Sequence, residues 1–167
     1  MESGKLEDWV ALGLLPGLGS ANVRRAVALF GDPGEVAHRV PVAELRAALG
    51  IRDRAASAVA AIRPALRRMA ESEVRRAEER GIAIVTPLDR RFPAALAEIP
   101  DPPPVLYMRG RLDEGVARVA VVGSRRASAY GRRVAAGLAA GLAARGVEVV
   151  SGGARGIDTC AHRGALE

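Results

Sequence analysis

Two consecutive segments near the end of this chain each contain a short apolar run, a glycine-bearing loop and the beginning of a helix. The first run, residues 119–122, precedes a Gly-Ser-Arg sequence at 123–125, and the second, residues 147–150, precedes a loop over 151–156. Apolar runs of this length beside glycine are typical of buried strands. A strand, a helix and a second strand in this order form a parallel pair with a right-handed crossover. The pattern therefore predicts an α/β fold with a parallel sheet.

Both loops have the features of a phosphate-binding site. Loops that follow neighbouring parallel strands lie at the same edge of the sheet, where the ligands of such folds bind. Each loop leads into a helix, whose first N–H groups have no internal partner and carry the positive end of the helix dipole. Glycine lets an anion approach this backbone closely, and arginine can hold a phosphate with two hydrogen bonds. The candidate DNA- or phosphate-binding residues are Gly123, Ser124, Arg125, Arg126, Ser151, Gly152, Gly153, Arg155 and Gly156.

Neither loop carries the fingerprint of a particular nucleotide-binding fold. Gly123 is not followed by the G-x-G-x-x-G spacing of dinucleotide sites, and the chain has no Gly-Lys-Ser/Thr of a Walker A loop. Glycine after a strand is also common for steric reasons alone. A purely structural role for the glycines therefore stays open as the alternative.

The first part of the chain is predicted to be a small helical domain over residues 1–63. Apolar residues recur there at helical spacing, and helices are expected at 42–49 and 53–62. The Pro-Gly-Leu-Gly turn at 16–19 is similar to a helix-hairpin-helix, in which glycine amides can hold a DNA phosphate. A tight turn whose glycines are needed only for packing is the favoured interpretation.

The second domain is assigned to residues 64–167. Pro64 is expected in the first turn of a new helix, where its missing N–H costs nothing. Short strands are expected at 82–85 and 105–108, ahead of the two strand–loop–helix segments. The whole chain is thus predicted to place a helical domain before a parallel-sheet domain.

The chain is basic, with 25 basic and 19 acidic residues and a formal net charge of +6. Lys5 is the only lysine, and arginine supplies a planar fork suited to phosphates. This charge favours a polyanionic partner, although codon bias explains the arginine content equally well. The single cysteine, Cys160, excludes an intrachain disulfide and a four-cysteine zinc site. No membrane helix or secretory signal is recognisable, so a cytoplasmic protein without a metal or membrane contact is expected.

The segments VAVVGSRRASAYG and VEVVSGGARGIDTCAHRGAL resemble the DNA-processing protein A (DprA/Smf) family. The preceding GIAIVTPLDRRFPAALAEIPDPPPVLYMRG is similar to the lead-in to that family's Rossmann-like core. The N-terminal helices resemble its small helical domain of the SAM or helix-hairpin-helix type. The family's Gly-Ser-Arg motif falls on residues 123–125, and its Ser-Gly-x-Ala-x-Gly-Ile-Asp motif falls on residues 151–158. The resemblance implies a Rossmann-like second domain.

The same resemblance implies a function. Members of the family bind single-stranded DNA through a basic pocket on the Rossmann-like domain and have no established catalytic chemistry. They deliver the strand to the RecA recombinase during natural transformation, usually as homodimers. Single-stranded DNA and RecA are therefore the expected partners, a homodimer is expected for the full-length protein, and no cofactor is expected. The family's core continues with further strands and helices, so the core of this chain is expected to be truncated at Glu167.

An enzymatic alternative starts from a similar opening. Nucleotide phosphoribohydrolases of the lysine-decarboxylase-like family share the strand, Gly-Ser loop and helix, but their downstream P-G-G-x-G-T-x-x-E motif is not in this chain. Release of free adenine from AMP would identify such an enzyme. Asp158 and His162 have a spacing compatible with a metal pair, although Asp158 is expected instead to accept backbone N–H bonds at the helix start. Tyr130 is expected to pack at the start of its helix, with stacking on a DNA base as the alternative.

Overall fold

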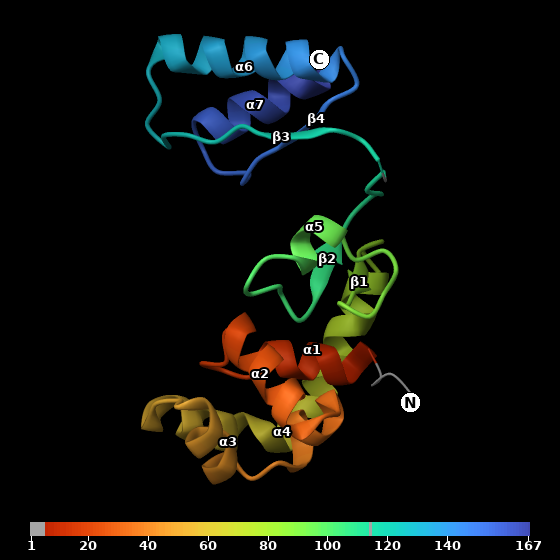
Figure 1. The fold of residues 1–167 in the computed structure, drawn as a ribbon, viewed down its shortest axis with the longest axis vertical. Coiled ribbons are helices and arrows are strands. Elements are labelled where there is room, and N and C mark those ends of the chain that lie inside the picture. Colours follow the sequence, from red (N-terminus) through yellow and green to blue (C-terminus); the bar gives the residue numbers. More distant parts are fainter. Residues whose placement is uncertain (1–5, 114) are drawn as a thin grey trace. The chain divides into compact units, whose positions relative to one another are not determined.

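The chain divides into two compact units, Met1–Leu112 and Asp113–Glu167, which are described separately below (Figure 1). The computed structural model describes residues 6–113 and 115–167, so Lys5 lies outside the described residues. The expected domain boundary between residues 63 and 64 falls inside a continuous helix, and the compact units meet instead at residues 112 and 113. No helix of the described residues is long and apolar enough to cross a bilayer.

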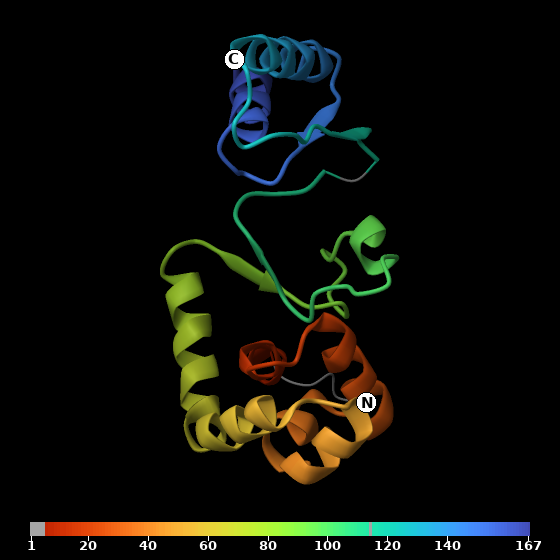
Figure 2. The same ribbon diagram turned by 90° about the vertical axis from the view of Figure 1, so that its left-hand side faces the viewer.

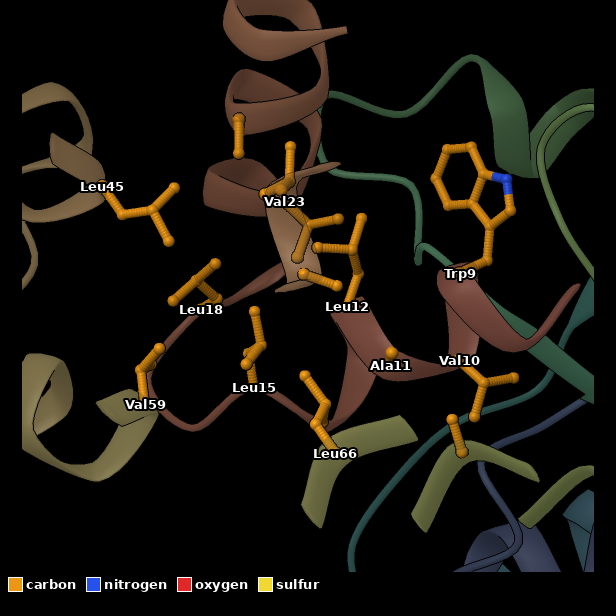
Figure 3. Packing of buried hydrophobic residues seen from close by; sticks show 14 of the residues in the cluster. Trp9, Val10, Ala11, Leu12, Leu15, Leu18, Val23, Leu45, Val59 and Leu66 are labelled. Carbon is orange, nitrogen blue, oxygen red and sulfur yellow. The ribbon is translucent and has the colours of Figure 1, made fainter. Parts of the chain in front are cut away.

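The first unit is mainly helical, as the sequence predicts. Its helices are α1 (Leu6–Leu14), α2 (Ser20–Phe30), the π-helical turn η1 (Glu35–Arg39), α3 (Val42–Leu49) and α4 (Asp53–Glu78). Apolar residues from these helices form one core, part of which Figure 3 shows. Among its labelled members are Leu12, Leu15, Leu18, Val23, Leu45, Val59 and Leu66.

The turn between α1 and α2 has a steric reason for its glycine. Gly17 has a φ of +77°, and a Cβ added there would lie 2.5 Å from the Cβ of Ala55. Only glycine combines this backbone conformation with so close an approach. The geometry agrees with the packing interpretation of the turn at 16–19.

The predicted helix break at Pro64 is wrong, because α4 runs from Asp53 to Glu78 with Pro64 inside it. Proline removes one helical hydrogen bond and clashes with the preceding turn, so it kinks a helix that continues through it. In Figure 2 the ribbon of α4 changes direction along its length. Buried residues on both arms, among them Val59 before the proline and Leu66 after it, keep the helix on the core.

Arg63, on α4, holds the C-terminal end of η1 against that helix through hydrogen bonds. Its guanidinium donates hydrogen bonds to the carbonyl oxygens of Val36, Ala37 and Val40, at 3.1, 3.0 and 2.6 Å. The last carbonyls of a helix have no partner within the helix, so a side chain that bonds them stabilises the helix end. Burial lowers the pKa of Arg63 from its ordinary value.

Two strands complete the first unit. β1 (Ala83–Val85) and β2 (Leu106–Met108) lie where strands are expected, and they pair antiparallel with Ile84 opposite Tyr107. The short helix α5 (Ala94–Ala97) lies between them in the chain. They form a two-stranded sheet of their own.

The second unit confirms the predicted parallel pair. β3 (Arg118–Ala120) pairs in parallel with β4 (Glu148–Val150), and Val121 continues the ladder by donating its N–H to the carbonyl of Val150 at 2.9 Å. α6 (Ala129–Ala143) connects the two strands and α7 (Ile157–Leu166) follows β4. Figures 1 and 2 show both helices on the same side of the strands. This is the strand, crossover helix and strand arrangement of a Rossmann-like core.

Helices α6 and α7 approach each other closely at Gly164, where a Cβ would overlap the backbone oxygen of Ala136. Gly164→Ala is therefore expected to destabilise the second unit by about 1 to 3 kcal/mol, the usual cost of overpacking. Gly137, on α6, serves as the control, because a Cβ added there would meet open space. Gly137→Ala is expected to stabilise by up to about 1 kcal/mol, because alanine is the better helix former. Urea unfolding followed by far-ultraviolet circular dichroism measures both, and equal effects would contradict the close approach.

Candidate phosphate-binding site

The two glycine loops, residues 121–128 after β3 and residues 151–156 after β4, lie side by side. The Ser151 hydroxyl donates a hydrogen bond of 2.7 Å to the carbonyl of Val121. The N–H of Ile157, at the start of α7, donates to the carbonyl of Ser124 at 3.2 Å. The structure thus brings together the two loops that the sequence singles out, at the carboxyl ends of two paired strands.

The hydroxyl groups of both candidate serines form hydrogen bonds within the protein. The Ser151 proton is already used within the protein, so this hydroxyl joins the loops and is not a free donor for a ligand. The Ser124 hydroxyl oxygen accepts the N–H of Arg126 at 3.0 Å and lies at the exposed surface. Ser124 thereby shapes the turn that carries the two neighbouring arginines.

Close packing explains why glycine occupies key positions in the loops. Gly156 has a φ of +93°, and a Cβ there would overlap the carbonyl oxygen of Ser124. A Cβ on Gly123 would lie 2.7 Å from the side chain of Ile157. These glycines let one loop and the start of α7 pack directly on the other loop. The steric interpretation therefore holds at both positions, and this packing sets where the arginines are presented.

Five arginines surround a cavity of about 560 Å³ beside these loops. We call it the arginine pocket, and its lining residues are Arg125, Arg126, Arg132, Arg155, Gly156, Thr159, Cys160 and Arg163. All five arginines are exposed, and none forms an ion pair within the described part of the chain. Among the described residues, none that lines the pocket is acidic. The result is a concave surface that carries concentrated positive charge.

The nearby acidic side chains are held elsewhere. Glu148 pairs with Arg118 through an Oε2–Nε distance of 2.6 Å. Asp158 is buried, and its Oδ2 accepts the N–H of Ala154 at 3.4 Å, which confirms the expected backbone-binding role. Thr159 holds the same loop from α7, because its hydroxyl donates to the carbonyl of Ala154 at 2.7 Å. The loop is thereby fixed without neutralising the arginine pocket.

The sequence prediction found only some of the pocket. Arg125, Arg126, Arg155 and Gly156 line it, whereas Gly123, Ser124, Ser151, Gly152 and Gly153 do not. Arg132, Thr159, Cys160 and Arg163 were missed. Residues 156, 159, 160 and 163 follow the spacing of one helix face, so this periodicity is a signal that could have found the α7 members.

Tyr130 corrects a further expectation. The expectation that it packs at the helix start is wrong, because 71% of its surface is exposed. It precedes Arg132, which lines the arginine pocket, by two residues on α6. Base stacking, the alternative interpretation, needs an accessible ring of this kind.

In the described part of the chain no group of three His, Cys, Asp or Glu side chains could hold a metal ion.

Known proteins with similar sequences share this part of the chain. The family model of DNA recombination-mediator protein A matches residues 83–167, about half of the chain. A DprA-type DNA processing protein of Mycobacterium tuberculosis is 63% identical over 68 residues, covering 39% of this chain and 18% of the relative. DNA processing protein DprA of Streptococcus pneumoniae is 44% identical over 81 residues, covering 48% and 28%. The sequence matches thus cover less than a third of the length of either relative.

The fold gives a longer match. The solved structure of DprA from Streptococcus pneumoniae is similar with a TM-score of 0.65 at 26% identity, covering 98% of this chain and 54% of that one. The helical part and the parallel-sheet part thus follow one another as they do in that structure. The chain therefore belongs to the DNA recombination-mediator protein A family, whose members are also named DprA or Smf.

Proposed function

We propose that this chain binds single-stranded DNA in the arginine pocket and contributes to recombination by presenting the strand to the RecA recombinase. The observation that carries the proposal is the group of five exposed, unpaired arginines around one cavity. The names of the relatives support a role in DNA processing and recombination. From the family resemblance we further propose that the full-length protein is a homodimer without enzymatic activity and that it acts in natural transformation.

The chemistry of the pocket favours a nucleic-acid backbone as its ligand. A volume of about 560 Å³ lies within the range of sites that hold a nucleotide-sized group. Guanidinium groups bind phosphate oxygens with charge-assisted hydrogen bonds, and they also stack on bases. None of the described lining residues is aromatic, so phosphates supply most of the recognition. Binding of this kind tolerates different base sequences.

The pocket offers little that a hydrolytic enzyme needs. The lining residues that the structure describes include no carboxylate, so they supply no carboxylic acid or base to a reacting group. Two lining residues, Thr159 and Cys160, carry a group that could act as a nucleophile. The Thr159 hydroxyl donates its proton to the carbonyl of Ala154, and no described carboxylate in the lining could activate the Cys160 thiol. These features support binding without chemistry.

Arg125→Ala tests the proposal. The lost guanidinium is expected to weaken binding to single-stranded oligo(dT) about tenfold to a hundredfold, the range for a hydrogen bond to a charged group. The slope of log K against log salt concentration should also fall in magnitude by about 0.7, because one phosphate contact is lost. Fluorescence anisotropy of a labelled oligonucleotide at several salt concentrations measures both.

Arg133→Ala is the matched control for this experiment. Arg133 is also exposed and lies on α6, but it does not line the arginine pocket. The variant loses the same charge, so it corrects for the general electrostatic attraction of a basic protein. If the two variants weaken binding equally, the arginine pocket is not the DNA site.

A further inference from the structure

A second, smaller cavity of about 260 Å³ lies within the first unit. It lies between the start of α1, the end of β1 and the loop that follows β1. We call it the indole pocket, and its lining residues are Leu6, Trp9, Ile84, Thr86, Leu88, Asp89 and Arg91. Four of these seven residues are apolar, whereas five of the eight residues that line the arginine pocket are arginines.

Trp9 gives the indole pocket an unused hydrogen-bond donor. Only 7% of its surface is exposed, yet its Nε1 is buried and has no hydrogen-bond partner among the described residues. In the view of Figure 3 the ring stands apart from Leu12 and Leu15, with its nitrogen on the edge farther from them. Buried indole N–H groups ordinarily find an acceptor, so this donor marks a place where one is missing.

Thr86 adds a second polar group to the same lining. It is buried, and its side chain makes no hydrogen bond within the described part of the chain. A hydroxyl can donate or accept, so it suits an amide as well as a carbonyl. Two unbonded polar groups in an apolar cavity are the usual pattern of a site that orients its ligand.

The charged residues of the indole pocket neutralise each other. The Arg91 guanidinium bonds both carboxylate oxygens of Asp89, with Nη2–Oδ2 at 2.6 Å and Nε–Oδ1 at 3.1 Å. Hydrogen bonds from Arg91 hold the pKa of the Asp89 carboxyl below its ordinary value, so the pair stays charged and matched at neutral pH. Among the described lining residues no charge is left without a partner, so the ligand is expected to be neutral.

The wall of the indole pocket is already formed. Asp89 accepts the backbone N–H of Arg91 on its side chain at 2.9 Å, and its backbone carbonyl accepts the N–H of Phe92 at the same distance. The N–H of Asp89 in turn donates to the carbonyl of Thr86, and Phe92 is buried beneath the loop. Binding of a ligand would therefore not cost the conformational entropy of ordering this loop.

Leu88 makes the rim of the cavity apolar, with 63% of its surface exposed. A volume of about 260 Å³ is below the range of most small-molecule sites and suits a single side chain with its peptide group. We propose that the indole pocket binds an apolar side chain of a partner polypeptide, whose adjacent backbone carbonyl accepts the hydrogen bond of Trp9 Nε1.

The chain offers a direct probe of this proposal, because Trp9 is its only tryptophan. In the ¹⁵N-labelled protein the indole N–H gives a single, well-separated resonance. Titration with N-acetyl-leucine amide, which has a leucine side chain between two peptide groups, is expected to shift this resonance downfield and to saturate. N-acetyl-glycine amide has the same carbonyls without the side chain, and we expect it to bind at least about tenfold more weakly. Free leucine, with charged ends, should also bind more weakly.

Leu88→Ser and Leu29→Ser form a matched pair of variants. Both leucines are exposed, so neither change threatens the fold, but only Leu88 lines the indole pocket. The Leu88 variant is expected to lose about tenfold in affinity for N-acetyl-leucine amide, and the Leu29 variant is expected to keep it. Trp9→Phe keeps an aromatic ring without the donor and should also weaken binding, followed then by the backbone resonances of Ile84 and Thr86.

Several results would overturn the proposal. Absence of a saturable shift up to the solubility limit of N-acetyl-leucine amide would do so, as would equal affinity for the glycine compound. Equal effects of the two serine variants would place the compound elsewhere on the surface. Tighter binding of free leucine would assign the pocket to a free amino acid instead of a polypeptide.

Discussion

Replacing Gly156 by alanine is expected to remove the arginine pocket and to destabilise the second unit by about 2 to 6 kcal/mol. Gly156 has φ +93° and ψ −126°, a conformation that only glycine adopts without strain. The added Cβ would also overlap the carbonyl oxygen of Ser124 and lie 2.9 Å from the Cα of Arg125. Relief of both problems requires the loop after β4 to move away from the loop after β3. Arg125 and Arg155 would then no longer line one cavity.

Gly153→Ala is the matched control, since it lies in the same loop. Its φ of +69° is also positive, but a Cβ there would meet open space. The expected cost is therefore backbone strain alone, about 1 to 2 kcal/mol. Hydrogen exchange of the β4 and α7 amides measures the stability of the second unit, and oligo(dT) affinity measures the pocket. Wild-type protection and affinity in Gly156→Ala would show that the loops do not need this contact.

The local sequence pattern predicted the second unit well. The strands predicted at 119–122 and 147–150 are present as β3 (Arg118–Ala120) and β4 (Glu148–Val150), and a helix follows each loop. Apolar runs, glycine and helical periodicity were enough to predict them. The parallel pairing followed from their order along the chain. These features depend on neighbours in sequence, which is why they could be predicted from one chain.

Contacts between distant residues limited the prediction elsewhere. Pro64 suggests a helix start by its local preference, but burial of residues on both sides of it keeps α4 continuous. In the candidate site, Ser151 was a candidate phosphate-binding residue, yet its hydroxyl donates a hydrogen bond to the carbonyl of Val121, directly after the neighbouring strand β3. Arg163 lies far along α7 from the glycine loop and enters the pocket only because helical turns bring residues 156 and 163 to one face.

The two pockets are expected to bind ligands of different charge. The arginine pocket presents five arginines that form no ion pair with any residue the structure describes, whereas Arg91 and Asp89 of the indole pocket pair with each other. Salt weakens the binding of a polyanion steeply but has little effect on the binding of a neutral, apolar group. DNA binding and the proposed peptide binding can therefore be separated in one titration series by raising the salt concentration.

Leu66→Ala is expected to destabilise the first unit by about 3 to 5 kcal/mol, as loss of a fully buried leucine does when its surroundings cannot collapse. Leu66 is completely buried in the core and lies two residues after Pro64 on α4. Proline inside a helix costs about 3 kcal/mol, so burial of the second arm must offset that cost for the helix to continue. The variant should therefore loosen α4 after the proline as well as lower overall stability.

Urea unfolding followed by Trp9 fluorescence measures this prediction, because the only tryptophan lies in the same core. Leu29→Ala removes the same atoms from a side chain that is 56% exposed, and its expected cost is below about 1 kcal/mol. Hydrogen exchange should show the amides of residues 66–78 losing protection before those of 53–62. Equal stability of the two variants would mean that packing of Leu66 is not what carries α4 through the proline.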